Sequence, residues 1–309
     1  LRSSNRKTVD SLNHNVISSL VSLGYNEVIT YSFVDEKEAL LFEEKDKMLF
    51  VQNPISQNMA FMRTSLISGL LNTFSYNFNH GQENQRLFEI GNTFKLQKNN
   101  KVIETKTVAG LMSGRLSPDN WNKKSTNVSF YDLKAVINDL LSMFDSSYSL
   151  KECNKEFLHP GISASVHLKN KELGCMGALQ PRYLENLDLK QDILIFSIEI
   201  NSLSKKSDSK FKSFSKFPSS SRDLAFLIDR GVDAENVQKT VAKSAGKFLK
   251  EISIFDVYEG EGIDPDKKSI ALSVSWQSMN QTLLDSDIDR AVEKIINSVK
   301  KEYGGELRI

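Results

Sequence analysis

A segment of low apolar content, residues 201–221, constrains the fold more than any other feature of the sequence. It contains nine Ser and five Lys against one Asp. A stretch of this composition cannot bury a core, and it favours a flexible, basic linker. The chain of 309 residues then divides into parts of roughly 200 and 95 residues, each long enough for its own core. We expect a first domain at 1–203, the linker at 204–216 and a second domain at 217–309.

The composition excludes several classes of protein. Hydrophobic residues make up 39% and charged residues 26%, which excludes a disordered or fibrous chain, and no apolar run approaches the ~18 residues of a membrane span. Cys153 and Cys175 are too few for a disulfide framework, no Cys/His spacing indicates a metal site, and the expected location is cytoplasmic. The 40 basic and 39 acidic residues exclude a broad basic surface that grips duplex backbone, so DNA is not an expected partner. They leave open the recognition of a few unpaired bases.

The first domain alternates helical and strand-like patterns. Apolar residues recur at helical spacing between Val9 and Leu23, and Gly24 suits the position after a helix end. A β-branched and aromatic stretch, NEVITYSF at 26–33, predicts a strand directly after this helix. Further helices are expected near 63–80 and 130–144, and further strands at 85–96, 106–114, 161–168, 172–179 and 193–200. This order predicts an α+β domain with a mostly antiparallel sheet.

The second domain shows a regular order of strands and helices. The expected elements are strands at 222–229, 250–258, 269–277 and 306–309, with helices at 234–246 and 286–302. This βαββαβ order predicts the ferredoxin-like motif, in which two helices cover one face of a four-stranded antiparallel sheet. The other face of the sheet is left open and can bind a ligand.

Two motifs of the first domain resemble class II aminoacyl-tRNA synthetases. LGYNEVIT (23–30), after a long helix, resembles their first signature, which builds a subunit interface, and RLFEIGNTFKLQ (86–97) resembles the start of their second. Lys95 stands where that signature has a nucleotide-binding Arg, and Gln97 where it has a Glu. Lys lacks the planar fork with which Arg clamps phosphate oxygens, and the Gly-rich third signature ending in Arg is missing. The resemblance therefore implies a class II-like fold without class II chemistry, and we expect no catalytic residue in this chain.

Longer motifs in both domains resemble the bacterial-type phenylalanyl-tRNA synthetase β subunits. These motifs are NPISQNMAFMRTSLISGLL (53–71), RLFEIGNTF (86–94), FYDLKAVINDLL (130–141), LHPGISA (158–164), GALQP (177–181), FP and RDLA (217–225), IFDVYEGEG (254–262) and TLLDSDI (282–288). The resemblance implies a non-catalytic core followed by a ferredoxin-fold anticodon-binding domain. It also implies an α2β2 heterotetramer whose α subunit charges tRNA(Phe) with phenylalanine using ATP and Mg²⁺, so that this chain binds no cofactor itself. Residues 8–33 would then form the interface with α, although an ordinary core helix is the alternative for 8–23, and Arg63 with the apolar stripe at 66–78 would support the fold.

The second domain offers a candidate site for an unpaired base on its open face. Asp256 and Tyr258 alternate on one strand and so share a face, and pairing across the 259–268 connection brings Ser269 near Tyr258. A Tyr ring stacks on a base, and a carboxylate accepts the N–H donors of a guanine edge. The family resemblance implies that these positions contact the anticodon, which begins with guanine: Tyr258 would stack, Asp256 would recognise the guanine, and Ser269 would make a supporting contact to a neighbouring base.

Some features of this site leave alternatives open. Ile252 and Ile254 share the face of Asp256 in a regular strand, so either the linker covers them or a β-bulge shifts the register. Arg222 and Arg308, at strand ends, could contact phosphate or form surface salt bridges. The site itself could be a solvated strand edge. For the whole chain, the alternatives are a self-sufficient single-chain class II synthetase and a small-molecule-sensing ferredoxin-like module.

Overall fold

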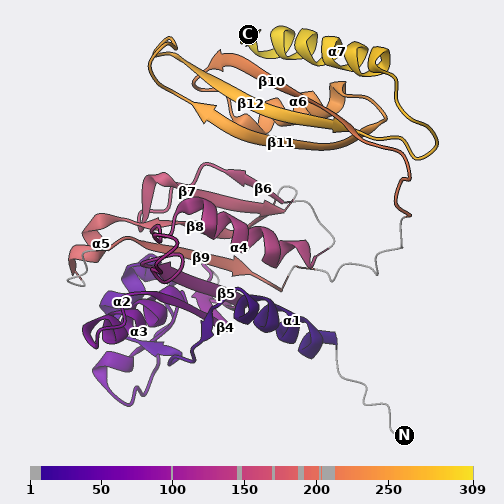
Figure 1. Ribbon diagram of the computed structural model, residues 1–309. Coiled ribbons are helices and arrows are strands. Elements are labelled where there is room, and N and C mark those ends of the chain that lie inside the picture. The colour runs from indigo at the N-terminus through magenta and orange to yellow at the C-terminus, as the bar shows by residue number, and fades with distance from the viewer. Residues whose placement is uncertain are drawn as a thin grey trace, which may run out of the picture. The chain divides into compact units, whose positions relative to one another are not determined.

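The protein's structure, a computed structural model, divides the chain into two units, Leu1–Ser209 and Lys210–Ile309 (Figure 1). It describes residues 8–98, 100–144, 148–168, 171–186, 191–201, 203 and 213–308. Residues 204–212 of the expected linker lie outside the described residues, so the linker stays a prediction. No helix in the described part of the chain combines the length and apolar character needed to cross a membrane.

The first unit is built on a seven-stranded sheet. The strands, in spatial order, are β1 (Asn26–Glu27), β4 (Gln85–Leu96), β5 (Val102–Ser113), β9 (Ile193–Glu199), β8 (Lys171–Leu179), β7 (Leu158–Leu168) and β6 (Tyr148–Lys151). Every neighbouring pair is antiparallel except β1 with β4. The expected α+β class with a mostly antiparallel sheet is therefore confirmed, and the sequence missed only the short strand β6 among these.

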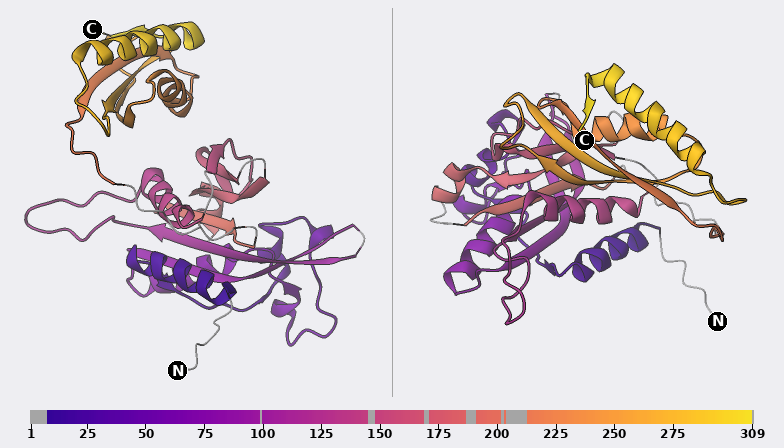
Figure 2. Two further views of the ribbon diagram at one scale, coloured as in Figure 1. Left: turned by 90° about the vertical axis from the view of Figure 1, so that its right-hand side faces the viewer. Right: turned by 45° about the horizontal axis from the view of Figure 1, so that its top comes forward.

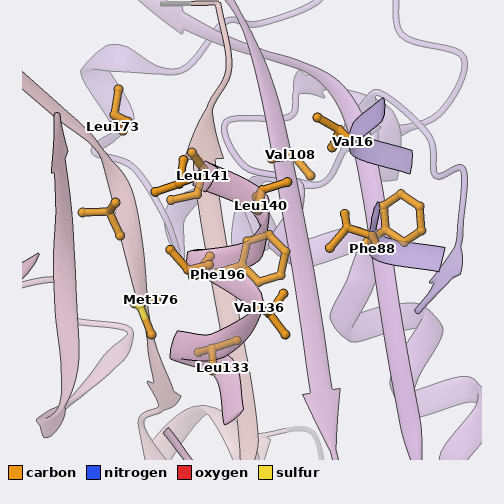
Figure 3. Packing of buried hydrophobic residues seen from close by; sticks show 14 of the residues in the cluster. Val16, Phe88, Val108, Leu133, Val136, Leu140, Leu141, Leu173, Met176 and Phe196 are labelled. Carbon is orange, nitrogen blue, oxygen red and sulfur yellow. The ribbon is translucent and has the colours of Figure 1, made fainter. Parts of the chain in front are cut away.

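Helices cover both faces of this sheet. Helices α1 (Thr8–Ser22) and α4 (Phe130–Ser142) pack on one face, where Val16 and Leu133 join a core with Phe88 and Phe196 (Figure 3). Helix α3 (Ile67–Asn79) packs on the other face, in a second apolar core. Because strand side chains alternate between faces, neighbouring residues of one strand enter different cores. The remaining elements are α2 (Glu36–Leu40), α5 (Pro181–Asn186), β2 (Phe33–Val34), β3 (Phe61–Met62) and the 3₁₀ turns Lys45–Lys47 and Gln57–Met59.

The strand expected at 26–33 is wrong for most of its length. Strand β1 ends at Glu27, and the amide of Val28 still donates to the carbonyl of Phe88 at 2.8 Å. At Thr30 the chain leaves the sheet, because its amide and hydroxyl both donate to the Glu89 carboxylate, at 3.3 and 2.7 Å. A side chain from the neighbouring strand thus replaces the backbone partner that a longer strand would need.

The same carboxylate anchors Arg63, which the sequence predicted to support the fold. Nη1 of Arg63 lies 2.6 Å from Oε1 of Glu89, and both side chains are almost fully buried. Nε of Arg63 also donates to the carbonyl of Asn92 at 2.9 Å. A Cβ at Gly91 would overlap the guanidinium, so strand β4 needs glycine there. The network connects β4, the chain around Thr30 and the segment leading into α3.

The second unit has the expected βαββαβ order. Its elements are β10 (Ser220–Asp229), α6 (Ala234–Ser244), β11 (Leu249–Tyr258), β12 (Lys267–Trp276), α7 (Asp285–Tyr303) and β13 (Glu306–Leu307). The strands form an antiparallel sheet in the order β11-β12-β10-β13. Both helices cover one face, where Phe226 and Leu272 pack with Val241 and Ile295, and the other face carries no helix of this unit (Figure 2).

Arg63→Met should lower the free energy of unfolding of the first unit by ~3–5 kcal/mol, because it leaves the Glu89 carboxylate buried without its partner charge. Urea denaturation of the full chain measures the change. Lys45→Ala is the control, since it removes a salt bridge with Glu36 between exposed side chains and should cost less than about 1 kcal/mol. Equal effects of the two substitutions would contradict the importance of the buried pair.

Candidate nucleic-acid interface

A β-bulge in β11 decides which side chains reach the open face of the second unit. Ile252 and Ile254 pair with Val274 and Leu272, on the side that packs against the helices. The register then shifts by one residue, so that Asp256 pairs with Ala271 and Tyr258 with Ser269. Directly paired residues of antiparallel strands point to the same face, and these four lie on the open one. Of the two explanations that the sequence left open, the bulge is therefore the one that the structure supports.

The residue added by the bulge is Phe255, which is exposed at the sheet edge. Val257, which pairs with Ile270, is on the helix-facing side, yet about half of its surface remains exposed. Strand β11 is an edge strand, so neither side chain is fully covered by the helices. The bulge is what allows one strand to place isoleucines in the core and then Asp256 and Tyr258 on the opposite face.

Tyr258 is held in place by the turn that follows it. Its hydroxyl donates to the carbonyl of Glu261 at 3.2 Å, and a Cβ at Gly260 would lie only 2.7 Å from that hydroxyl oxygen. The ring therefore rests against the backbone of Gly260, a residue that the sequence analysis did not single out. Because 38% of Tyr258 remains exposed, the ring is both positioned and accessible for stacking.

Arg308 reaches the same face from the opposite edge of the sheet. Its amide donates to the carbonyl of Ala225 at 2.7 Å, and its guanidinium carbon lies 5.8 Å from the centroid of the Tyr258 ring. This distance is within the range of a cation–π contact. Because Arg308 follows the edge strand β13 and Tyr258 ends the other edge strand, β11, this contact spans the two central strands, where Ala225 and Ala271 pair on the same face. The structure thus brings Asp256, Tyr258, Ser269 and Arg308 to one face.

Two of the expected site residues are not exposed side chains of the open face. Ser269 pairs with Tyr258 as predicted but is only 4% exposed, because it lies on a central strand between Tyr258 and Leu227. Arg222 pairs with Val274 on the helix-facing side and donates to Asp285 of α7 at 3.1 Å. The structure does not bring Arg222 to the other four residues, and it forms the surface salt bridge that the sequence allowed. Its contact with phosphate stays a prediction.

In the first unit, the side chain of Lys95 is held by a contact within its own domain. Its ammonium forms a salt bridge with Glu43, whose side chain is largely buried. Burial alone would raise the pKa of Glu43, but the hydrogen bond and charge of Lys95, together with the Glu44 amide and the charge of Lys47, hold this pKa below its ordinary value. Lys95, which the sequence comparison placed at a nucleotide-binding position, is therefore engaged with its own domain.

Both parts of the chain match known families. Residues 2–200 match the family described as "Phenylalanyl tRNA synthetase beta chain CLM domain", and residues 215–308 match "Ferredoxin-fold anticodon binding domain". The first match alone covers more than half of the chain.

Three curated relatives, each named phenylalanine–tRNA ligase beta subunit, show the extent of the similarity. The protein of Hahella chejuensis is 37% identical over 289 residues, which are 94% of this chain and 36% of that relative. The protein of Francisella tularensis is 37% identical over 308 residues, 98% of this chain and 37% of its own length. That of Fusobacterium nucleatum is 36% identical over 296 residues, 94% of this chain and 37% of its own. The chain thus spans little more than a third of the length of these relatives.

Acidification should weaken the first unit partly through Glu43. Its folded pKa is below its unfolded pKa, so its contribution to stability is present above the unfolded pKa and is lost as the pH falls through the folded pKa. Glu43→Gln should therefore reduce stability at pH 7 more than at pH 3, as measured by urea denaturation at the two values. A variant whose stability is reduced equally at both would contradict the proposed role of this salt bridge.

Proposed function

The chain belongs to the phenylalanyl-tRNA synthetase beta chain family, and we propose that it recognises the anticodon of tRNA(Phe) and scaffolds a catalytic α subunit. The matches support this interpretation and neither of its alternatives, the single-chain synthetase and the small-molecule sensor. Recognition falls to the second unit and scaffolding to the first. Both serve the ATP-dependent charging of tRNA with phenylalanine in the cytoplasm.

The observation that carries the proposal is the shared face of Asp256, Tyr258 and Arg308. An unpaired base stacks on the Tyr258 ring, which contributes about 1–3 kcal/mol. Asp256 accepts from the paired N–H donors of guanine, and only guanine among the four bases presents two such donors side by side on its pairing edge. Arg308, already over the ring, adds a cation that can contact the base or an adjacent phosphate. Ser269 supports this arrangement from the neighbouring strand.

The first unit contributes structure and no chemistry in this proposal. The catalytic residues, ATP and Mg²⁺ belong to the α subunit, and two α and two β subunits form the enzyme. Apolar side chains that α would cover follow α1, among them Ile29, which is 92% exposed, and Tyr31. Val16 and Leu20 of α1 pack into the core of the first unit. Val21 of the same helix remains exposed, so this helix also offers an apolar side chain that α could cover.

Tyr258→Ala should weaken binding or charging of tRNA(Phe) by about 1–3 kcal/mol, the contribution of one stacked base. The assay is aminoacylation by the complex with α, with tRNA-independent activation of phenylalanine as the reference reaction that should not change. Tyr258→Phe keeps the ring and should retain most of the affinity.

Phe255→Ala is the matched control for this substitution, because it removes an exposed aromatic ring from the same strand at the bulge. Binding of tRNA should be unaffected. Loss of charging in Phe255→Ala together with normal charging in Tyr258→Ala would show that the open face is not the recognition surface.

Co-expression with an α subunit should yield a hetero-oligomer, measured by size-exclusion chromatography with light scattering. Ile29→Asp should disrupt it, because the substitution places a charge in an apolar interface. Tyr76→Asp, at an exposed position of α3 outside residues 8–33, is the control and should assemble normally. If Ile29→Asp assembles as well as the unmodified chain, residues 8–33 are not the interface.

A further inference from the structure

The chain between β5 and α4, residues 114–128, forms a hairpin that extends away from the sheet of the first unit (Figure 2, left). Its stem is paired by the amide of Leu116, which donates to the carbonyl of Thr126 at 2.8 Å. Strand β4 fixes its base, since Nη2 of Arg86 donates to the Leu116 carbonyl at 2.6 Å. The amide of Arg115 donates to Oδ1 of Asn84 at 2.7 Å. The 114–128 hairpin is thus attached to the sheet at its base.

Side chains also fix the tip of this hairpin. Oδ1 of Asn120 accepts hydrogen bonds from the amides of Asn122 and Lys123, both at 2.9 Å. Oδ1 of Asp119 accepts from the amide of Ser125, again at 2.9 Å. Asn and Asp side chains that bind the backbone in this way define tight turns. The turn therefore has a specific conformation, and the residue at its centre has a specific position.

That central residue is Trp121, and 98% of it is exposed. The chain has two tryptophans, and the other, Trp276, is 2% exposed with its indole donating to the Ala245 carbonyl at 2.9 Å. An ordered turn that holds the largest aromatic side chain fully in water leaves a large favourable burial unused within this unit. Such a side chain is a typical anchor for a partner.

The charges beside Trp121 indicate the chemistry of that partner. Lys123 and Lys124 follow two and three residues later and are exposed. Within the described part of the chain, neither lysine forms an ion pair, whereas Arg115 is paired with Asp119. Lysine is depleted at the centres of protein–protein interfaces, but an aromatic ring with adjacent cations is the usual arrangement for single-stranded nucleic acid.

We propose that the 114–128 hairpin binds unpaired RNA, with Trp121 stacked on a base and Lys123 and Lys124 beside the flanking phosphates. This site is on the first unit and shares no residue with the open face of the second. The proposed function assigns the first unit only a scaffolding role, so the inference adds a second, independent RNA contact.

The two tryptophans make a direct test possible in the full chain. A single-stranded oligoribonucleotide of about 12 nucleotides, within the usual site size, should quench the tryptophan fluorescence. Trp121→Phe retains only the buried Trp276 and should show no quenching. Trp121→Ala should bind the same oligonucleotide about 5- to 150-fold more weakly by fluorescence anisotropy, the range expected from one stacked base. Tyr76→Ala, which removes an exposed ring elsewhere on the same unit, should bind normally.

Two further measurements complete the test: the salt dependence of RNA binding and quenching in a variant of the second unit. The double variant Lys123→Ala/Lys124→Ala should reduce the slope of log affinity against log salt by about 1.4, since two phosphate contacts are lost. Quenching should persist in Tyr258→Ala, so failure of the anticodon proposal and failure of this one are separate results. Absence of quenching, or equal RNA affinity in Trp121→Ala, would overturn the proposal. Loss of the α subunit from Trp121→Ala with RNA affinity unchanged would also overturn it and assign the tip to a protein contact.

Discussion

The buried pair of Arg63 and Glu89 is the interaction on which the first unit depends. Two opposite charges removed from water are stable only when their remaining hydrogen-bonding groups are satisfied. Thr30, the Asn92 carbonyl and the space left by Gly91 meet this requirement. The partners come from chain segments far apart in sequence, so the pair can form only when strand β4, the connection after β1 and the segment before α3 are all in place. It therefore specifies one arrangement of these segments, besides any stability that it contributes.

Residue patterns within single helices and strands predicted most of the fold correctly. Where these predictions were wrong, contacts between elements explain the difference. The ferredoxin-like order followed from alternating apolar residues, and the structure confirms all six elements. The strand expected at 26–33 ended early, because β-branched composition reports strand propensity and carries no information about the Glu89 carboxylate that captures Thr30. Helix α3 begins at Ile67 and not near 63, because contacts with other segments hold the backbone at Arg63 as in a strand. The amide of Arg63 donates to the Ser32 carbonyl, and its carbonyl accepts from the Phe94 amide.

The candidate site also combines features that residue patterns predict with features that only contacts between elements determine. Alternation along β11 and pairing with β12 were enough to place Asp256, Tyr258 and Ser269 together. The conflict between Ile254 and Asp256 was visible in the sequence, but only the observed register identifies the bulge. The contacts of Arg222 and Arg308 depend on strand order and on the aspartates of α7, and the support of Tyr258 by Gly260 depends on the path of a turn. Alternation with Leu224 and Phe226 could have placed Arg222 on the helix-facing side, whereas its aspartate partner and the turn that supports Tyr258 depend on contacts that no periodicity reports.

The nearly equal numbers of basic and acidic residues in the second unit bear on how this unit would bind RNA. Residues 211–309 carry 15 basic and 16 acidic residues, so no long-range field draws the second unit to a polyanion. The proposed stacking on Tyr258 and acceptance by Asp256 need no such field, because both would act at contact distance on a base that is already unpaired. A carboxylate at the centre of a strongly basic surface would instead be neutralised by neighbouring cations and lose its preference for the guanine edge. Neutrality thus favours selection of a base over affinity for the backbone, which is the property that an anticodon-reading surface requires.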